Sequence, residues 1–298
     1  MLLEKIRRGL AALGIAALSL TPAAPAFARS SGPALWEVKD KDTTVYLFGT
    51  IHLLPKDSQW RTPKFEKAVQ GSQSLVVETI IDTSNPQKIA GIMSALGYSS
   101  GLPPIASRVP ADKRAQLEAA MAKTQIPRAL FDRMETWMAS FMLLGVQFQT
   151  LGVEGEQGVE SVLRQSFAAA GKQVGELETN QEQFTFFDRL PEDAQRKLLE
   201  GAIENPAEMK EQFGGMLQAW LSGDVDKIGN SFNRDLQSSP ELKAALLTRR
   251  NFNWSQWIER RMSQPGTVMV AVGAGHLAGD SSVQRYLQSR GYKVKRLQ

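Results

Sequence analysis

Only two histidines occur in the chain, His52 and His276, and both stand three residues after a glycine. Each Gly-x-x-His segment directly follows an apolar run typical of a β-strand, residues 45–48 and 268–272. A glycine at such a point permits a sharp departure from the strand. Two neutral imidazoles brought together suit a divalent transition metal or acid–base chemistry near neutral pH. One histidine alone is more often structural, but the matched pair favours a shared site.

Two glutamates also fall at predicted strand ends. Glu78 follows the apolar run 74–77, and Glu178 ends a strand that is entered through a glycine turn at residue 171. The carboxyl ends of parallel strands share one edge of an open sheet, so these carboxylates are expected near the histidines. Together they suit Zn, Mn, Fe or Co, with a position left open for water. The alternative for each glutamate is a solvated or capping group.

A further candidate pair, Arg250 and Asn251, lies at the end of a helix that is predicted to begin at Pro240. The planar guanidinium of an arginine can hold a substrate carbonyl or carboxylate through paired hydrogen bonds. The alternative is a basic residue that interacts with a helix C-terminus or lies on a solvated face.

The order of predicted elements favours an α/β fold. Strands and helices alternate at both ends of the chain, and a long helical stretch lies on each side of the strand that ends at Glu178. We predict a mostly parallel central sheet flanked by helices, with a largely helical cap formed by insertions at about 86–151 and 188–264. Strands are expected at 36–38, 43–48, 74–77, 171–178, 267–272 and 293–297, and helices outside the second insertion at 63–71, 86–97, 110–123, 128–149, 158–170 and 281–289.

The first 28 residues have the pattern of a cleavable signal peptide. Basic residues precede the apolar stretch 9–20, and Ala26-Phe27-Ala28 forms a small-x-small cleavage site. A membrane anchor is the alternative, but this stretch is shorter than the roughly 20 residues that a spanning helix needs. We therefore predict a periplasmic or secreted protein with one domain over residues 29–298 and no stable membrane span after cleavage.

Composition excludes several classes of function. The chain has no cysteine, so disulfides, thiolate metal ligands and a cysteine nucleophile are ruled out. Removing the signal takes away three basic residues and one acidic residue, which lowers the formal net charge from +4 to +2. Such a mild basic excess gives no reason to expect nucleic-acid binding.

Taken together, these separated motifs resemble the TraB/GumN family, which includes the Tiki proteins. The resemblance covers nearly the whole mature chain and depends on five segments: residues 47–52, the strand ending in Glu78, residues 171–179, Arg250-Asn251, and residues 272–277. Because Tiki relatives are metalloproteases that act on secreted proteins, it implies a metal-dependent hydrolase. Carried onto this chain, it nominates His52, Glu78 and His276 most strongly, followed by Glu178, Arg250 and Asn251.

The sequence therefore predicts an exported metal-dependent hydrolase with peptidase activity on a peptide or protein substrate. In this interpretation His52, His276 and Glu78 bind a divalent ion, while Glu78, Glu178, Arg250 and Asn251 supply the catalytic groups. Two alternatives stay open. One is a non-catalytic protein whose cleft holds a metal, a haem-like ligand or a peptide, and the other is an accessory protein of envelope or exopolysaccharide assembly. The sequence does not define the substrate, the metal or the oligomeric state.

Overall fold

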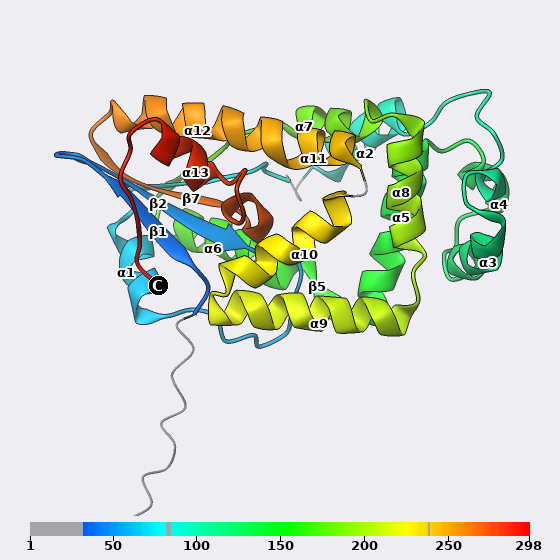
Figure 1. Ribbon diagram of the computed structural model, residues 1–298, viewed down its shortest axis with the longest axis horizontal. Coiled ribbons are helices and arrows are strands. Elements are labelled where there is room, and N and C mark those ends of the chain that lie inside the picture. Colours follow the sequence, from blue (N-terminus) through cyan, green and yellow to red (C-terminus); the bar gives the residue numbers. More distant parts are fainter. Residues whose placement is uncertain (1–31, 82–84, 238) are drawn as a thin grey trace, which may run out of the picture. The chain divides into compact units, whose positions relative to one another are not determined.

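The computed structural model describes residues 32–81, 85–237 and 239–298 (Figure 1), and the predicted signal peptide, residues 1–28, lies outside them. A six-stranded sheet in the order β6-β4-β7-β2-β1-β8 forms the centre of the fold. Strands β6, β4, β7 and β2 pair in parallel, whereas β1 is antiparallel to both β2 and β8. The strands are β1 (Leu35–Lys39), β2 (Thr43–Thr50), β4 (Ser74–Val77), β6 (Gln173–Glu176), β7 (Gly266–Gly273) and β8 (Val294–Arg296). The predicted α/β class with a mostly parallel sheet is confirmed.

Helices cover both faces of this sheet (Figure 1). In β7, Met269 and Ala271 pack on one side with α1 (Pro63–Gly71) and α6 (Val159–Ala169). The alternate residues Val268, Val270 and Val272 pack on the other side with α12 (Arg249–Met262) and α13 (Val283–Ser289). A strand buried on both faces is expected to be continuously apolar, as residues 268–272 are.

The helical insertions have an apolar core of their own, built mainly from α3, α4, α5 and α8. The first insertion holds α2 (Pro86–Leu96), α3 (Arg114–Ala122), α4 (Arg128–Phe131) and α5 (Thr136–Thr150). The second holds α7 (Asn180–Asp188), α8 (Glu192–Ala202), α9 (Pro206–Ser222), α10 (Val225–Gln237), α11 (Pro240–Lys243) and a π-helical turn, η4 (Ala244–Thr248). A small two-stranded sheet, β3 (Leu54–Pro55) with β5 (Val153–Glu154), follows the first Gly-x-x-His segment.

Two predicted helices differ in the structure. The helix expected at 110–123 begins as a 3-10 turn and becomes α-helical only at Arg114. The helix expected at 128–149 is divided into α4 and α5, because Met134 forms a β-bridge with Tyr98 and Glu135 N–H donates to the carbonyl of Gly97. The buried Arg108 stabilises this break through hydrogen bonds to the carbonyls of Asp132 and Met134.

The second insertion also differs from the prediction at two points. It begins earlier than residue 188, since Thr179 and Glu182 form a capping box that starts α7 at Asn180. Arg250 and Asn251 do not lie at the C-terminal end of the helix from Pro240, as the sequence predicted. The helical run from Pro240 continues through η4 into α12, so both residues occupy the first turn of a long helix.

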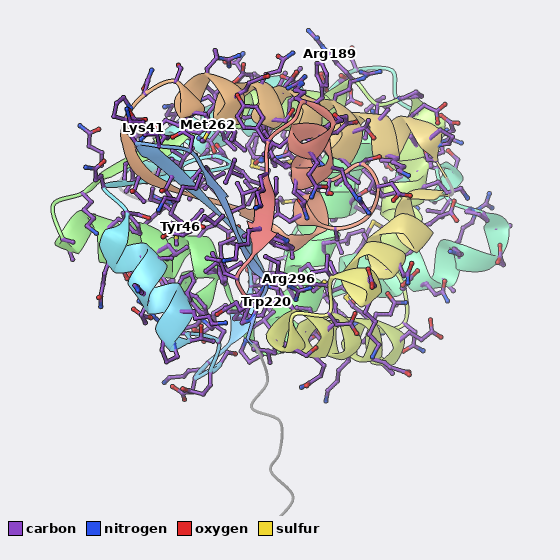
Figure 2. The ribbon with its side chains drawn as sticks, turned by 60° about the vertical axis from the view of Figure 1, so that its left-hand side comes forward. Lys41, Tyr46, Arg189, Trp220, Met262 and Arg296 are labelled. Atoms are coloured by element: carbon purple, nitrogen blue, oxygen red, sulfur yellow. The ribbon has the colours of Figure 1, made fainter. Side chains whose placement is uncertain are left out.

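Helix α9 joins the second insertion to the carboxyl edge of the sheet. Trp220 of α9, labelled in Figure 2, is buried and donates its indole N–H to the carbonyl of Gly49 at 2.8 Å. Ile228 of α10 packs in the same apolar cluster as Trp220. Within the described residues, no helix is both long enough and apolar enough to cross a bilayer.

Candidate functional site

Four strands end side by side at the carboxyl edge of the sheet, and each is followed by a predicted site residue. His52 comes two residues after β2, Glu78 directly after β4, Glu178 two residues after β6, and His276 three residues after β7. The register pairs Thr50 with Gly273, so β2 and β7 end at the same level, and it pairs Val77 with Ala271, so β4 ends two residues before them.

The space above Gly273 shows how closely three of these side chains approach one another. A methyl carbon at Gly273 would lie 3.1 Å from Glu78 Oε1, 3.5 Å from His276 Cδ2 and 3.8 Å from His52 Nε2. The structure therefore brings both histidines and Glu78 around one point, and the absence of a side chain at Gly273 leaves that point open.

His276 is buried, and its tautomer follows from its neighbours. Asn251 Nδ2 donates to the carbonyl of Ser281 at 2.7 Å, which turns Asn251 Oδ1 toward His276 Nδ1, 2.6 Å away. Since this oxygen can only accept, Nδ1 carries the proton and Nε2 presents a lone pair. Burial lowers the pKa of His276 to about 3, so the ring is neutral at neutral pH.

His52 has a different environment. Its side chain is 66% exposed, and Nδ1 lies 2.7 Å from Glu160 Oε1. The Glu160 carboxylate raises the pKa of His52 to about 9, an effect that water at the exposed ring partly screens. The approach of α6 requires Gly158, because a β-carbon there would lie only 2.0 Å from the carbonyl oxygen of His52.

Arg250 is buried behind the histidines, and each of its three nitrogens donates to a protein group. Nε donates to Glu178, and Nη2 donates to Glu78 at 2.6 Å and pairs with Glu178 at 2.9 Å. Nη1 donates to the carbonyl of Leu246 and to His276 Nε2, each at 3.3 Å. Four of the five guanidinium N–H groups therefore have protein acceptors, and the positive charge is paired with two buried carboxylates. The geometry therefore fits a positioning role better than the predicted contact with substrate.

The two predicted glutamates are held differently. Glu78 Oε1 accepts from Gly273 N–H at 2.6 Å, and Oε2 accepts from Arg250. Burial acts to raise the pKa of Glu78. The opposing effect is larger and lowers the pKa to about 2; it comes from the charges of His276, Arg250 and His52 and from the hydrogen bond that Gly273 donates. Glu178 has both oxygens engaged by Arg250 and one also by Trp254 Nε1. Burial raises the pKa of Glu178, against the opposing effect of Arg250.

Glu160 is the site residue that the sequence analysis missed. It lies in the first turn of α6, bonds to His52, and accepts a hydrogen bond from Thr50. Because it follows no strand, the strand-end pattern could not identify it. An acidic residue in the first turn of a helix is commonplace, since it complements the helix dipole.

The donor chemistry of three residues fits a metal ion. Each histidine has Nδ1 held by an oxygen, which is the usual arrangement of metal-ligating histidines, and its Nε2 lies near Glu78. A metal ion bound to His276 Nε2 would replace the hydrogen bond that this nitrogen accepts from Arg250 Nη1. His276 Nε2 and Glu78 Oε1 are 3.7 Å apart, a span that an ion about 2 Å from each could bridge. Across residues 32–81, 85–237 and 239–298, no three His, Asp or Glu side chains form a complete preassembled ligand set. Glu178 does not fit as a ligand, because both its oxygens are engaged.

Comparisons with known proteins identify relatives of this chain. The chain is 24% identical over 247 residues to proteins of Escherichia coli (strain K12) and Shigella flexneri, each named "Uncharacterized protein YbaP", and the alignment covers 82% of this chain and 87% of each relative. No solved structure matches the chain. The family model of the TraB/PrgY/gumN family matches residues 34–296, and the chain therefore belongs to that family.

Proposed function

We propose that this protein is a divalent-metal-dependent hydrolase that cleaves peptide bonds. The observation that carries the proposal is the open point above Gly273, around which His52, Glu78 and His276 converge. Neutral imidazole nitrogens and a carboxylate are ligands that Zn, Mn, Fe and Co accept. When bound, the ion would supply Lewis acidity for hydrolysis.

The residues of the chain have separate roles in this proposal. His52, His276 and Glu78 hold the ion, while Glu160 and Asn251 orient the two imidazoles through Nδ1. Of the two predicted glutamates, only Glu78 borders the open cleft beside His52, so we assign the ligand or proton-accepting role to it.

Arg250 and Glu178 support the site from behind. Arg250 keeps Glu78 ionised and fixes one of its oxygens, and Glu178 holds Arg250 in place with Trp254. The charged groups of both side chains are buried and paired with each other. We assign both to positioning.

A peptide or protein substrate is supported by the resemblance to the Tiki metalloproteases and by the size of the cleft. The cleft beside His52 and Glu78 has a volume of about 560 Å³ and is lined by charged residues that include Glu156 and Arg164. Such a lining can solvate and hydrogen-bond a peptide main chain.

The decisive experiment combines metal analysis with digestion of an unbiased peptide library. Protein purified without chelators is expected to contain a divalent metal, and the metal-loaded form is expected to cleave library peptides, with loss of cleavage after chelation. Glu78→Gln should abolish cleavage. Glu176→Gln, which removes an exposed carboxylate at the end of β6, is the matched control and should retain it. Full cleavage by Glu78→Gln, or by metal-free protein, would contradict the proposal. Metal or peptide binding without any turnover would favour a binding protein instead.

We also propose export through the N-terminal signal. Residues 1–28 carry the basic, apolar and Ala26-x-Ala28 pattern described above. N-terminal sequencing of the protein from its native host should begin at Arg29. A secreted form that retains Met1 would exclude this proposal, and a membrane-retained full-length form would favour an anchor.

A further inference from the structure

Two hollows meet at the candidate site, and both are bordered by His52 and Glu78. The first is the cleft of about 560 Å³ already described, which we call the polar groove; its polar lining includes Glu156, Glu160, Ser161, Arg164 and Gln183. The second has a volume of about 280 Å³, and we call it the apolar pocket; its walls include Phe187, Met216, Trp220, Ile228, Leu246 and Leu247. A molecule bound over His52 and Glu78 could extend into both.

Apart from the site residues His52, Glu78 and His276 and from Thr50 and Arg250, the side chains that line the apolar pocket are apolar. The indole N–H of Trp220 is used by the carbonyl of Gly49, and four of the five guanidinium N–H groups of Arg250 donate to other residues. A polar side chain that entered would lose its hydration without gaining partners. The pocket therefore discriminates against polar and charged groups.

The size of the apolar pocket limits what it can hold. At about 280 Å³ it lies just below the range of roughly 300–1,000 Å³ that is typical for drug-sized ligands. It has room for one large side chain but not for an extended peptide. The polar groove is about twice as large and carries charges of both signs, which suits a hydrated main chain.

We propose that the apolar pocket binds one large apolar side chain of the substrate, such as Leu, Met or Phe, while the polar groove holds the adjoining main chain. The peptide bond beside that residue then lies over His52 and Glu78. This inference rests on the proposed peptidase function and names its substrate class, namely peptides with a large apolar residue next to the cleaved bond.

Binding of small probes tests the pocket without requiring turnover. The probes are the acetylated amides of Leu, Phe, Ala and Glu, added to the full-length mature protein with and without Zn²⁺, with the indole N–H signals followed by NMR. The Leu and Phe amides should bind at least about tenfold more tightly than the Ala and Glu amides, because burial of a large apolar side chain is worth at least that factor. Trp220 should be among the signals that shift.

Two substitutions alter the pocket in opposite directions. Met216→Trp should fill it and weaken binding of the Phe amide at least about tenfold. Leu246→Ala should enlarge it and shift the preference toward larger side chains, so that the acetylated amide of Trp gains relative to that of Leu. The matched control is Gln218→Trp, which adds the same ring on the exposed side of α9 and should leave binding unchanged. Thermal unfolding shows whether each variant folds. If Met216→Trp does not fold, the binding preference of Leu246→Ala decides whether the pocket is used.

The outcomes separate this inference from the proposed function. Selective binding of the apolar amides without any peptide cleavage would support the pocket and overturn the hydrolase. Cleavage with no preference for a large apolar residue, or equal binding of all four amides, would overturn the pocket alone. Octanoate is the probe for an acyl ligand, and binding as tight as that of the Phe amide would overturn the assignment to a peptide side chain.

Discussion

The two Gly-x-x-His segments produce imidazoles with opposite properties. His52 is largely exposed and has its pKa raised to about 9 by Glu160, whereas His276 is buried and has its pKa lowered to about 3 by desolvation. Both follow parallel strands whose ends are level in the sheet. The motif therefore determines where the imidazole stands, and residues from other elements determine whether it carries a proton.

The partners of the two rings explain this difference. Glu160 is an anion that stabilises a protonated His52. Asn251 is a neutral acceptor, and the neighbouring Arg250 cation opposes any further positive charge on His276. Both partners nevertheless orient their imidazole in the same way. Each one contacts Nδ1, which directs Nε2 toward Glu78. A shared site can thus be built from one basic and one non-basic imidazole.

The largest expected effect comes from removing the cation behind His276. Arg250→Met should destabilise the protein by about 3–5 kcal/mol, because it leaves the buried carboxylates of Glu78 and Glu178 without their partner. Urea unfolding at pH 7 measures this loss. The neighbouring Arg249 is exposed, so Arg249→Met is the matched control and should change stability by no more than about 0.5 kcal/mol. Equal losses of stability in the two variants would show that the buried ion pairs of Arg250 stabilise the protein no more than an exposed arginine does.

Replacing each histidine should separate catalysis from folding. His52→Ala and His276→Ala should each reduce metal-dependent cleavage more than about 100-fold, since loss of an orienting partner alone typically costs about 10–100-fold. Their stabilities should differ. His276→Ala should lower the free energy of unfolding by about 1–3 kcal/mol, because it leaves the buried Asn251 without its partner. His52→Ala should lower it by less than about 1 kcal/mol, because the His52 side chain is exposed. Activity and unfolding measured on the same metal-analysed preparations test both statements. Wild-type activity in both variants would mean that the histidines are structural.

The sequence predicted the parts of this site that depend on local patterns. Apolar runs that end in a glycine or a carboxylate located the strand ends, and the shared edge of parallel strands placed His52, Glu78 and His276 together. The predicted α/β class was correct for the same reason, since strand and helix periodicities are local properties of the chain.

Features that depend on distant contacts could not be predicted in this way. Arg250 pairs with Glu178 and with Glu78, which lie 72 and 172 residues away, and no local pattern reveals these partners. The break between α4 and α5 likewise depends on Tyr98 and on Arg108, both outside that segment. Sequence reasoning therefore proposed a substrate contact for an arginine whose environment fits a positioning role.

The pH dependence of stability should differ between the two histidines. His276 binds a proton less readily in the folded state than in the unfolded state, so its contribution to stability is lost as the pH falls from about 6.5 toward 3. His52 binds a proton more readily when folded, so its contribution is lost as the pH rises from about 6.5 through 9. Glu78 adds a further loss as the pH falls from 4.5 toward 2.

Nitrogen-15 NMR of the untagged, metal-free protein measures both rings directly, because the chain has only two histidines. At pH 7, one imidazole should be protonated, and the other should be neutral with its proton on Nδ1. Urea unfolding across pH 5–10 should show the alkaline loss of stability in the wild type and a flatter profile in His52→Gln. Two rings that titrate together near pH 6.5 would contradict the contrast on which this comparison rests.

The smallest expected effect concerns the groups that hold Nδ1 of each ring. Glu160→Gln keeps a hydrogen-bond acceptor for His52 but removes the charge, so the pKa of His52 should fall back toward 6.5 while the ring keeps its orientation. The metal affinity of the neutral ring, measured at a pH where His52 is deprotonated in both proteins, should weaken by about tenfold because the ligand is less basic. Asn251→Asp does the reverse at His276, because it adds a carboxylate where a neutral amide now accepts, and should raise the pKa of that ring. Metal titrations and ring NMR on the two variants give the comparison. If the charge states of His52 and His276 do not move in these opposite directions, Glu160 and Asn251 are not what sets the two imidazoles apart.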